Sequence, residues 1–224
     1  MIYDGCVDTA AIAQLLQPFI SLDETRLRSI SKYIDLLLKW NARINLTAVR
    51  VPEEVVQRHF GESFFAANHI LSQRLSEKRS LEKRSLESVI DLGSGAGFPG
   101  VPFAMLASDV QVTLIESNQK KATFLRELVF LLELKNVKVF SERAEQYAQS
   151  AGLVTMRAVE KFDKALPLAV RLAEPGGQIA LMIGASQEPE ARKLAPQVEW
   201  SEPVVVPGGH SRVLLVGTKM TKVE

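Results

Sequence analysis

In the first 70 residues, apolar positions recur at intervals of three and four, which predicts helices. Asp8 can cap a short helix that stops near Pro18, and Asp23 can cap a second helix. Pro52 fits the first turn of a third helix that runs towards His59. The apolar stripe of the second helix consists of Leu27, Ile30, Ile34, Leu37 and Leu38.

From residue 88 onward, short apolar runs alternate with helical segments such as Gln119 to Leu134. This alternation predicts a mostly parallel α/β sheet. A Pro-Gly-Gly turn at 207–209 separates the last two runs and indicates an antiparallel hairpin at one edge. The expected strands are Val89 to Leu92, Val110 to Ile115, Val137 to Phe140, Leu153 to Met156, Gln178 to Ile183, Val198 to Val206 and Arg212 to Val216.

This pattern is typical of the Rossmann-like sheet of class I methyltransferases, here with an N-terminal helical extension. We expect three parts: the extension (1–70), a charged linker or helix (71–87) and a ligand-binding domain (88–224). The linker contains a tandem duplication, Glu-Lys-Arg-Ser-Leu at 77–81 and again at 82–86. Two copies of five residues do not make a repeat protein, and the balanced charge favours a solvated segment.

Composition excludes several classes of protein. The chain has 224 residues, of which 46% are hydrophobic, enough for a sizeable core. Cys6 is the only cysteine and there are three histidines, so we expect no disulfide and no metal site. The chain lacks an apolar run of membrane-spanning length and a secretion signal, so we expect a cytoplasmic protein, and we take it to be a monomer. The net charge of +1 means that any nucleic-acid contact would use a local patch.

A glycine-rich loop after the first strand is the clearest candidate site. Residues 93–100 read Gly-Ser-Gly-Ala-Gly-Phe-Pro-Gly and lie between a strand and a helix. At the carboxyl end of a parallel sheet, such a loop makes a ligand cradle, because glycine allows positive φ and lets a ligand touch the backbone. A purely structural turn would need one glycine rather than four.

Two ligands fit this loop. Gly95 to Gly100 matches the dinucleotide pattern G-x-G-x-x-G, and Glu116 lies 21 residues after Gly95, where a ribose-binding acid belongs. However, Asp91 would repel a pyrophosphate, and Pro99 removes an N–H that should bind it. S-adenosylmethionine has no phosphate, and its ammonium group would be attracted by Asp91. We therefore favour S-adenosylmethionine and keep a dinucleotide as the alternative.

Several stretches together resemble one family. The loop from Asp91 to Gly100 resembles the signature of the bacterial 16S ribosomal RNA (guanine-N7) methyltransferase G family, also called glucose-inhibited division protein B. Further matching stretches occur in the expected order over Trp40 to Gly184. They are Trp40-Asn41, Asn45-Leu46-Thr47-Ala48-Val49, Arg58-His59 with Ser63, Lys120-Lys121 with Phe124-Leu125, Arg143-Ala144-Glu145 and Arg157-Ala158-Val159.

The resemblance implies methyl transfer from S-adenosylmethionine to N7 of a guanine in the 530 loop of 16S ribosomal RNA, free or within the small ribosomal subunit. It implies that Gly93 and Phe98 line the cofactor pocket, that Ala144 and Glu145 meet the adenine, and that Arg157 lies at the mouth. Combined with the loop analysis, the cofactor-binding candidates are Asp91, Gly93, Gly95, Gly97, Phe98, Glu116, Ala144, Glu145 and Arg157. The candidates for substrate contact are Asn45, Arg58, His59, Lys120, Lys121 and Arg157.

The implied chemistry needs no catalytic base. N7 of guanine carries a lone pair and no proton at neutral pH, and the sulfonium methyl is already activated, so alignment is the main requirement. Two departures from the family pattern, Gly152 in place of an acidic residue and Ile183 in place of a lysine, are expected near the mouth of the site. They keep open a methyltransferase fold that binds without turnover, and a non-RNA substrate is a further alternative.

Overall fold

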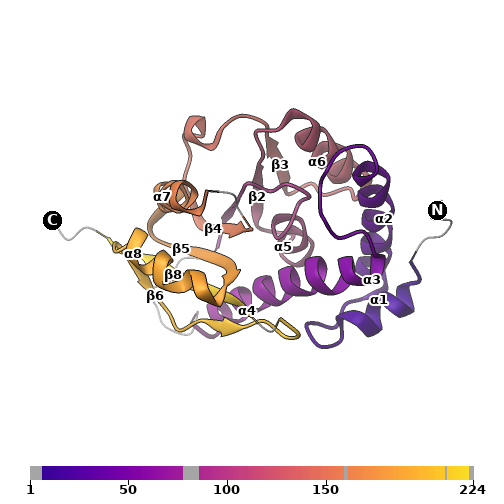
Figure 1. Ribbon diagram of the computed structural model, residues 1–224, viewed down its shortest axis with the longest axis horizontal. Coiled ribbons are helices and arrows are strands. Elements are labelled where there is room, and N and C mark those ends of the chain that lie inside the picture. The colour runs from indigo at the N-terminus through magenta and orange to yellow at the C-terminus, as the bar shows by residue number, and fades with distance from the viewer. Residues whose placement is uncertain (1–6, 78–85, 159–160, 210, 222–224) are drawn as a thin grey trace.

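The computed structural model describes residues 7–77, 86–158, 161–209 and 211–221, without the side chains of 75–77. Five parallel strands come first along the sheet: β1 (Ser88–Leu92), β2 (Gln111–Ile115), β3 (Val137–Phe140), β4 (Ala151–Arg157) and β5 (Ala173–Gly184). The strand β8 (Arg212–Lys219) is antiparallel to β5 and to the short strands β6 (Val198–Trp200) and β7 (Val204–Val205). The order is β3-β2-β1-β4-β5-β8-β6, with β7 also on β8. Figure 1 shows the C-terminal strands on the opposite side of the molecule from the first helices of the chain. The predicted fold class is confirmed.

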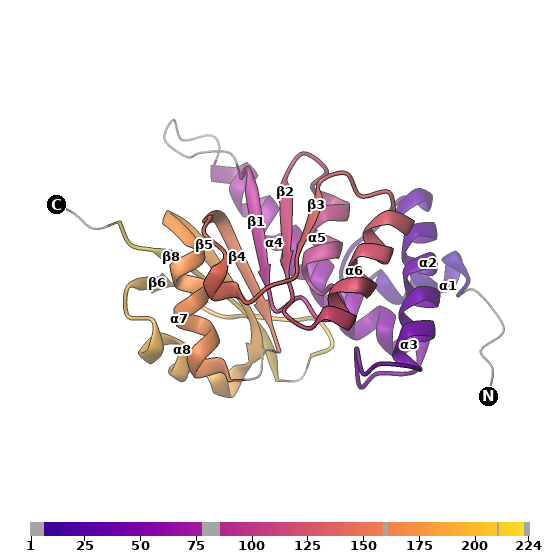
Figure 2. The ribbon, with the colours of Figure 1, turned by 90° about the horizontal axis from the view of Figure 1, so that it is seen from above.

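Helices cover both faces of the sheet (Figure 2). One apolar core lies beneath α7 (Phe162–Leu172) and α8 (Glu188–Leu194). On the other face, α5 (Gly100–Leu106) and α6 (Gln119–Leu131) share a core with the N-terminal helices. No helix in the described ranges is long and apolar enough to cross a membrane.

The N-terminal helices begin where the capping residues predict. In α1 (Thr9–Leu16) the Asp8 side chain accepts from the Ala10 N–H, and in α2 (Glu24–Asn41) the Asp23 side chain accepts from the Arg26 N–H at 2.8 Å. The predicted stripe of α2 faces the core, where Ile30, Ile34 and Leu37 are fully buried.

The third predicted helix is longer and less regular than the sequence indicates. It starts as α3 (Pro52–Glu54), widens into a π-helical segment, η1 (Val55–Gly61), and continues as α4 (Glu62–Glu77). At its start, α4 contacts the end of β4, where Glu62 pairs with Arg157; at its other end, Arg74 donates to the Gly152 carbonyl at 3.1 Å. The helix therefore runs antiparallel to β4, from the end of that strand to its start.

Two strand predictions differ from the structure. The single strand expected over Val198 to Val206 is two strands, because Pro203 has no N–H to donate to a ladder and lies between β6 and β7. The fifth strand starts at Ala173 rather than Gln178, with an irregularity in its pairing to β4. The division at residues 70 and 87 stays a prediction, since α4 continues to Glu77 and most of the duplicated pentapeptide lies outside the described residues.

Close packing of α5 on β1 and β2 depends on Gly100, the first residue of α5. A Cβ added there would lie 2.7 Å from Asp91 Oδ2 and would collide with the Leu114 side chain. We predict that Gly100→Ala lowers the free energy of unfolding by about 1–3 kcal/mol, the usual cost of overpacking. Urea denaturation would measure this.

Gly184→Ala is the matched control, because its Cβ would meet no atom closer than 3.7 Å and its φ is −69°. We expect this variant to stay within about 0.5 kcal/mol of the wild type. Equal stabilities of the two variants would contradict the packing argument.

Candidate functional site

The parallel strands end at one edge of the sheet, which we call the carboxyl edge, and the predicted site residues gather there. The glycine loop (residues 93–100) follows β1, Glu116 follows β2, and Arg157 is the last residue of β4. Because β8 runs the opposite way, Arg212 at its start pairs with Gly184 at the end of β5 and joins the same edge.

The outer and inner halves of the glycine loop differ in packing. Gly93, Gly95 and Gly97 have positive φ values of 72°, 56° and 92°. Gly93 is exposed, and a Cβ on Gly95 would meet nothing closer than a carbonyl oxygen at 3.8 Å. Gly97 is buried, and a Cβ there would collide with the Tyr33 hydroxyl. The outer half therefore offers open backbone to a ligand, whereas the inner half is part of the core.

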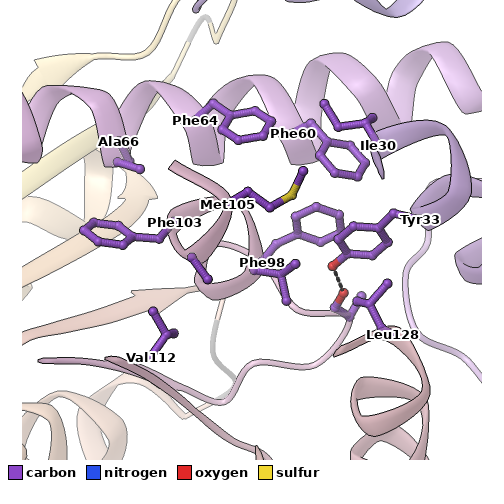
Figure 3. Close-up of a cluster of buried hydrophobic side chains, with 14 of the residues drawn as sticks. Ile30, Tyr33, Phe60, Phe64, Ala66, Phe98, Phe103, Met105, Val112 and Leu128 are labelled. Carbon is purple, nitrogen blue, oxygen red and sulfur yellow. Dashed lines mark hydrogen bonds between the residues drawn. The ribbon is translucent and has the colours of Figure 1, made fainter. Parts of the chain in front are cut away.

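The inner half of the loop is held by Tyr33 of α2 (Figure 3). Its hydroxyl donates to the Ala96 carbonyl, and its ring stacks on Phe98 with centroids 5.1 Å apart. Phe60 meets Phe98 edge-on at 5.0 Å. Tyr33 is fully buried, and burial raises its pKa well above the ordinary value, so the hydroxyl keeps its proton. The N-terminal extension thus shapes the loop directly, and Phe98 faces the extension's aromatic side chains.

Asp91 lies beneath the loop rather than at its surface. It is completely buried, Oδ2 accepts from the Gly100 N–H at 3.1 Å, and Oδ1 accepts from the Thr155 hydroxyl at 2.9 Å. Burial raises the pKa of its carboxyl to about 6, and these hydrogen bonds oppose the shift. The side chain therefore anchors the start of α5, and a direct contact between Asp91 and a ligand stays a prediction.

Glu116 lies beside the open half of the loop. Oε2 accepts from the Gly95 N–H at 3.0 Å, and Oε1 accepts from the Asn118 N–H at 2.7 Å. Each carboxylate oxygen has a second lone pair. The two backbone contacts orient the carboxylate and leave acceptor capacity for a vicinal diol.

Ala144 and Glu145 form a short 3-10 turn, η2 (Ala144–Gln146), after β3. Ala144 is buried, and its carbonyl accepts from Arg171 of α7 at 2.7 Å. Glu145 is exposed. The turn therefore holds the Ala144 carbonyl in place and exposes the Glu145 side chain at the carboxyl edge.

Arg157 connects the sheet to the helical extension. Its Nη1 donates to His59 Nδ1 at 3.0 Å, and its Nη2 donates to the Arg58 carbonyl at 2.7 Å and to Glu62 Oε2 at 3.1 Å. Its side chain is only 14% exposed. Burial lowers its pKa from the ordinary value, and Glu62 opposes the shift. Arg212 Nη2 lies 2.5 Å from Glu62 Oε1, so one buried carboxylate serves two guanidinium groups.

His59 is held neutral within this cluster. Arg157 can only donate, so Nδ1 must be the acceptor and Nε2 carries the proton, which points to the Thr47 hydroxyl at 2.7 Å. Burial, followed by the charges of Arg157, Arg58 and Arg212, lowers its pKa to about 3. Among the described residues, no cluster of three or more His, Cys, Asp or Glu could hold a metal ion.

The other substrate candidates are more exposed. Asn45 lies in the loop after α2, and Lys120 and Lys121 are in the first turn of α6, where Asn118 Oδ1 accepts from both backbone N–H groups. The side chain of Arg58 is 46% exposed and pairs with Glu54 at 2.6 Å. These residues surround the carboxyl edge but are not brought into one cluster.

One of the two departures from the family pattern lies far from its expected place at the mouth of the site. Gly152 is the second residue of β4, at the edge opposite Arg157, so its expected position was wrong. Ile183 is next to the carboxyl edge but is buried in the core beneath α7 and α8.

Four residues of the site were missed as candidates: Tyr33, Thr47, Glu62 and Arg212. A signal exists for one of them. Tyr33 lies three residues after Ile30, on the apolar stripe of α2. The predicted hairpin joins the last strand to the run from Val198 to Val206, and only the structure places Arg212 opposite Gly184 at the end of β5. The contacts of Thr47 and Glu62 depend on tertiary packing.

The low pKa of His59 predicts a pH dependence of stability. In the unfolded chain this histidine titrates near 6.5, so between about pH 6.5 and 3 the unfolded state binds a proton that the folded state does not. Folding free energy contributed by neutral His59 is therefore lost as the pH falls. From pH 7.5 to 5 we expect the wild type to lose about 2 kcal/mol more than His59→Gln, measured by urea denaturation.

The difference between the two proteins cancels the contributions of the other titrating groups to the pH dependence of stability. One of them is Asp91, whose raised pKa makes the folded state more stable as the pH falls. Parallel pH profiles for the two proteins would contradict a buried, neutral His59.

Solved structures with a similar fold are methyltransferases. A SAM-dependent methyltransferase from Aquifex aeolicus matches with a TM-score of 0.50 and 20% identity over 66% of this chain and 89% of that chain. An O-methyltransferase family protein from Burkholderia thailandensis matches with a TM-score of 0.53 and 13% identity, over 91% of this chain and 74% of that chain. At such low identity these matches show the fold alone.

Sequence relatives are more specific. Ribosomal RNA small subunit methyltransferase G from Chromobacterium violaceum is 36% identical over 89% of this chain and 92% of its own length. The protein of the same name from Nitrosomonas eutropha is 35% identical over 88% of this chain and 89% of its own length. The family model described as rRNA small subunit methyltransferase G matches residues 26–212. The chain therefore belongs to the rRNA small subunit methyltransferase G family.

Proposed function

We propose that this protein transfers the methyl group of S-adenosylmethionine to N7 of a guanine in the 530 loop of 16S ribosomal RNA. The observation that carries the proposal is the pairing of an open glycine backbone with an oriented carboxylate at the carboxyl edge. A Cβ on Gly95 would meet open space, and Glu116 accepts a hydrogen bond from the Gly95 N–H. Membership of an rRNA methyltransferase family supports the substrate class.

The site residues fit S-adenosylmethionine. Gly95 would receive it against its backbone, since a side chain there would fill the open space, and the exposed Gly93 would lie beside it. Glu116 would accept from the ribose hydroxyls, and the turn of Ala144 and Glu145 would meet the adenine. Gly97, Phe98 and Asp91 are buried, so we assign them to holding the loop in shape.

The residues of the chain act by alignment. When bound, the cofactor supplies a methyl group activated by a positive sulfur. The attacking N7 carries its own lone pair, so no group has to remove a proton. His59 is neutral and already donates to Thr47, which suits a fixed structural part of the wall rather than a base.

Positive charge at the carboxyl edge would orient the RNA. Arg157 is held by Glu62, His59 and the Arg58 carbonyl, so we assign it to positioning the wall of the site. Arg58, Lys120 and Lys121 would contact phosphates, which position an RNA without reading its sequence. The target base would be unpaired, because the major-groove N7 edge of an RNA duplex is inaccessible to side chains.

The test uses labelled S-adenosylmethionine with intact small ribosomal subunits, naked 16S ribosomal RNA, and a protein mixture, all from cells that lack the endogenous enzyme. Label recovered as 7-methylguanosine in the 530 loop is the expected result, and the better substrate would show which form of the RNA is read. A methylated base other than 7-methylguanosine would overturn the proposed specificity.

Other outcomes separate the alternatives. Cofactor binding in a parallel titration without transfer to any substrate would favour a binding module. Label in protein would favour a non-RNA methyltransferase, and binding of NAD in place of S-adenosylmethionine would favour a dinucleotide site.

The hydroxyl of Tyr33 offers a test of the loop's role. Tyr33→Phe leaves the buried Ala96 carbonyl without its donor, at a cost of about 1–3 kcal/mol. We expect the loop to be less ordered in this variant, so that part of this free energy is lost from cofactor binding. S-adenosylmethionine should then bind roughly 5- to 10-fold more weakly, measured by calorimetry, while the KM for RNA is unchanged.

Tyr147→Phe is the matched control. It also removes one phenol hydroxyl, but that hydroxyl contacts Thr113 and Gln149 rather than the loop. Equal cofactor affinity in both variants would contradict a role for Tyr33 in shaping the site.

A further inference from the structure

A groove lies between α6 and β3, away from the candidate site. It has a volume of about 770 Å³ and is lined on its apolar side by Val129, Phe130, Leu134 and Val139. Phe130 is 85% exposed, the largest exposed fraction among the exposed large hydrophobic side chains of the described residues. A phenyl ring left in solvent costs free energy, and a ring beside a groove is a common contact for a partner.

Cations surround this ring. Arg126 lies one helical turn before Phe130, Lys135 follows the end of α6, and Lys138 lies on β3. Glu133 is the single acidic residue in the lining. Three positive charges against one negative make the groove basic, although the whole chain carries a formal charge of only +1.

An exposed stripe of α6 runs from the candidate site to the groove. Gln119, Thr123, Arg126 and Phe130 are separated by four, three and four residues, so they form one helical stripe. All four side chains are exposed, and Gln119 is at the start of the helix next to Glu116. The stripe is about 16 Å long from Gln119 to Phe130. Lys120 and Lys121 lie at the end of this path nearest the glycine loop.

We propose that the groove between α6 and β3 is a second RNA contact, in which an unpaired base stacks on Phe130 while Arg126, Lys135 and Lys138 bind the adjoining phosphates. This rests on the proposed function, since it is a contact for the same RNA substrate. An aromatic ring flanked by cations is how single-stranded RNA is bound without a sequence code. The contact would hold a nucleotide flanking the methylated guanine and so fix the register of the loop.

Charge favours RNA over a protein partner. A protein segment that filled the apolar groove would not need three flanking cations unless it were acidic, whereas RNA supplies both a flat apolar face and phosphates. A second copy of the chain would bring the same positive charges together, which opposes a symmetric dimer through this groove.

The test compares Phe130→Ala with Val205→Ala, an equally simple truncation of an exposed apolar residue on β7. Filter binding would measure affinity for naked 16S ribosomal RNA and for assembled small subunits, and calorimetry would measure affinity for S-adenosylmethionine. We expect Phe130→Ala to bind RNA about 5- to 100-fold more weakly, the range seen for loss of one base–aromatic stack, with cofactor affinity unchanged. Val205→Ala should match the wild type in both measurements.

The charges are tested through salt. Lys138→Gln should reduce the slope of log affinity against log salt by about 0.7, the value for one phosphate contact on a single strand. Lys193→Gln, an exposed lysine on α8 across the sheet, should leave the slope unchanged.

Several results would overturn the proposal. Wild-type affinity of Phe130→Ala for both RNA substrates would do so directly. Weaker binding to subunits alone, with naked RNA unaffected, would indicate a ribosomal protein in the groove. A wild-type dimer that dissociates in Phe130→Ala, seen by sedimentation, would indicate a second copy. Because RNA binding is measured without turnover, failure here is distinguishable from failure of the methyl-transfer assay.

Discussion

The contact on which the candidate site depends most is the one between Tyr33 and the glycine loop. A loop of glycines is conformationally free, and its conformation must be imposed from outside. Here the core domain supplies Asp91 and Glu116, and the extension supplies a hydroxyl for Ala96 and a ring for Phe98. Two parts of the chain that look separable in sequence therefore build one site.

The same dependence appears in the charged cluster around Glu62. A buried carboxylate between Arg157 and Arg212 is costly to desolvate, and a pair of this kind is weak evidence for stability. Its contribution is positional: residues from η1, α4, β4 and β8 meet at one point. Neutral His59 adds no further positive charge and extends the hydrogen bonding to Thr47. The helical extension is thus joined to the sheet by directed contacts as well as by apolar packing.

Much of the fold could be predicted from the sequence, because local signals carry it. The caps at Asp8 and Asp23 and the order of strands and helices follow from side-chain chemistry and periodicity. The site was predicted less completely. Spacing along the chain pointed to Glu116 and the glycines as candidates, whereas Thr47 reaches His59 and Glu62 reaches Arg157 only through tertiary packing. Burial could not be predicted either: Asp91 and Phe98 were proposed as cofactor contacts, both side chains are buried, and a contact of either one with the cofactor stays a prediction.

The course of α4 has a consequence for how this family can vary. The helix starts beside Arg157 at the carboxyl edge and ends beside Gly152 at the opposite edge, and β1 begins at that same far edge. The connection from Glu77 to Ser88 therefore joins two points remote from the glycine loop. An insertion between these two points would therefore enter the chain away from the ends of the strands at the carboxyl edge. Insertions could accumulate at this position during evolution while the geometry of the candidate site stayed the same.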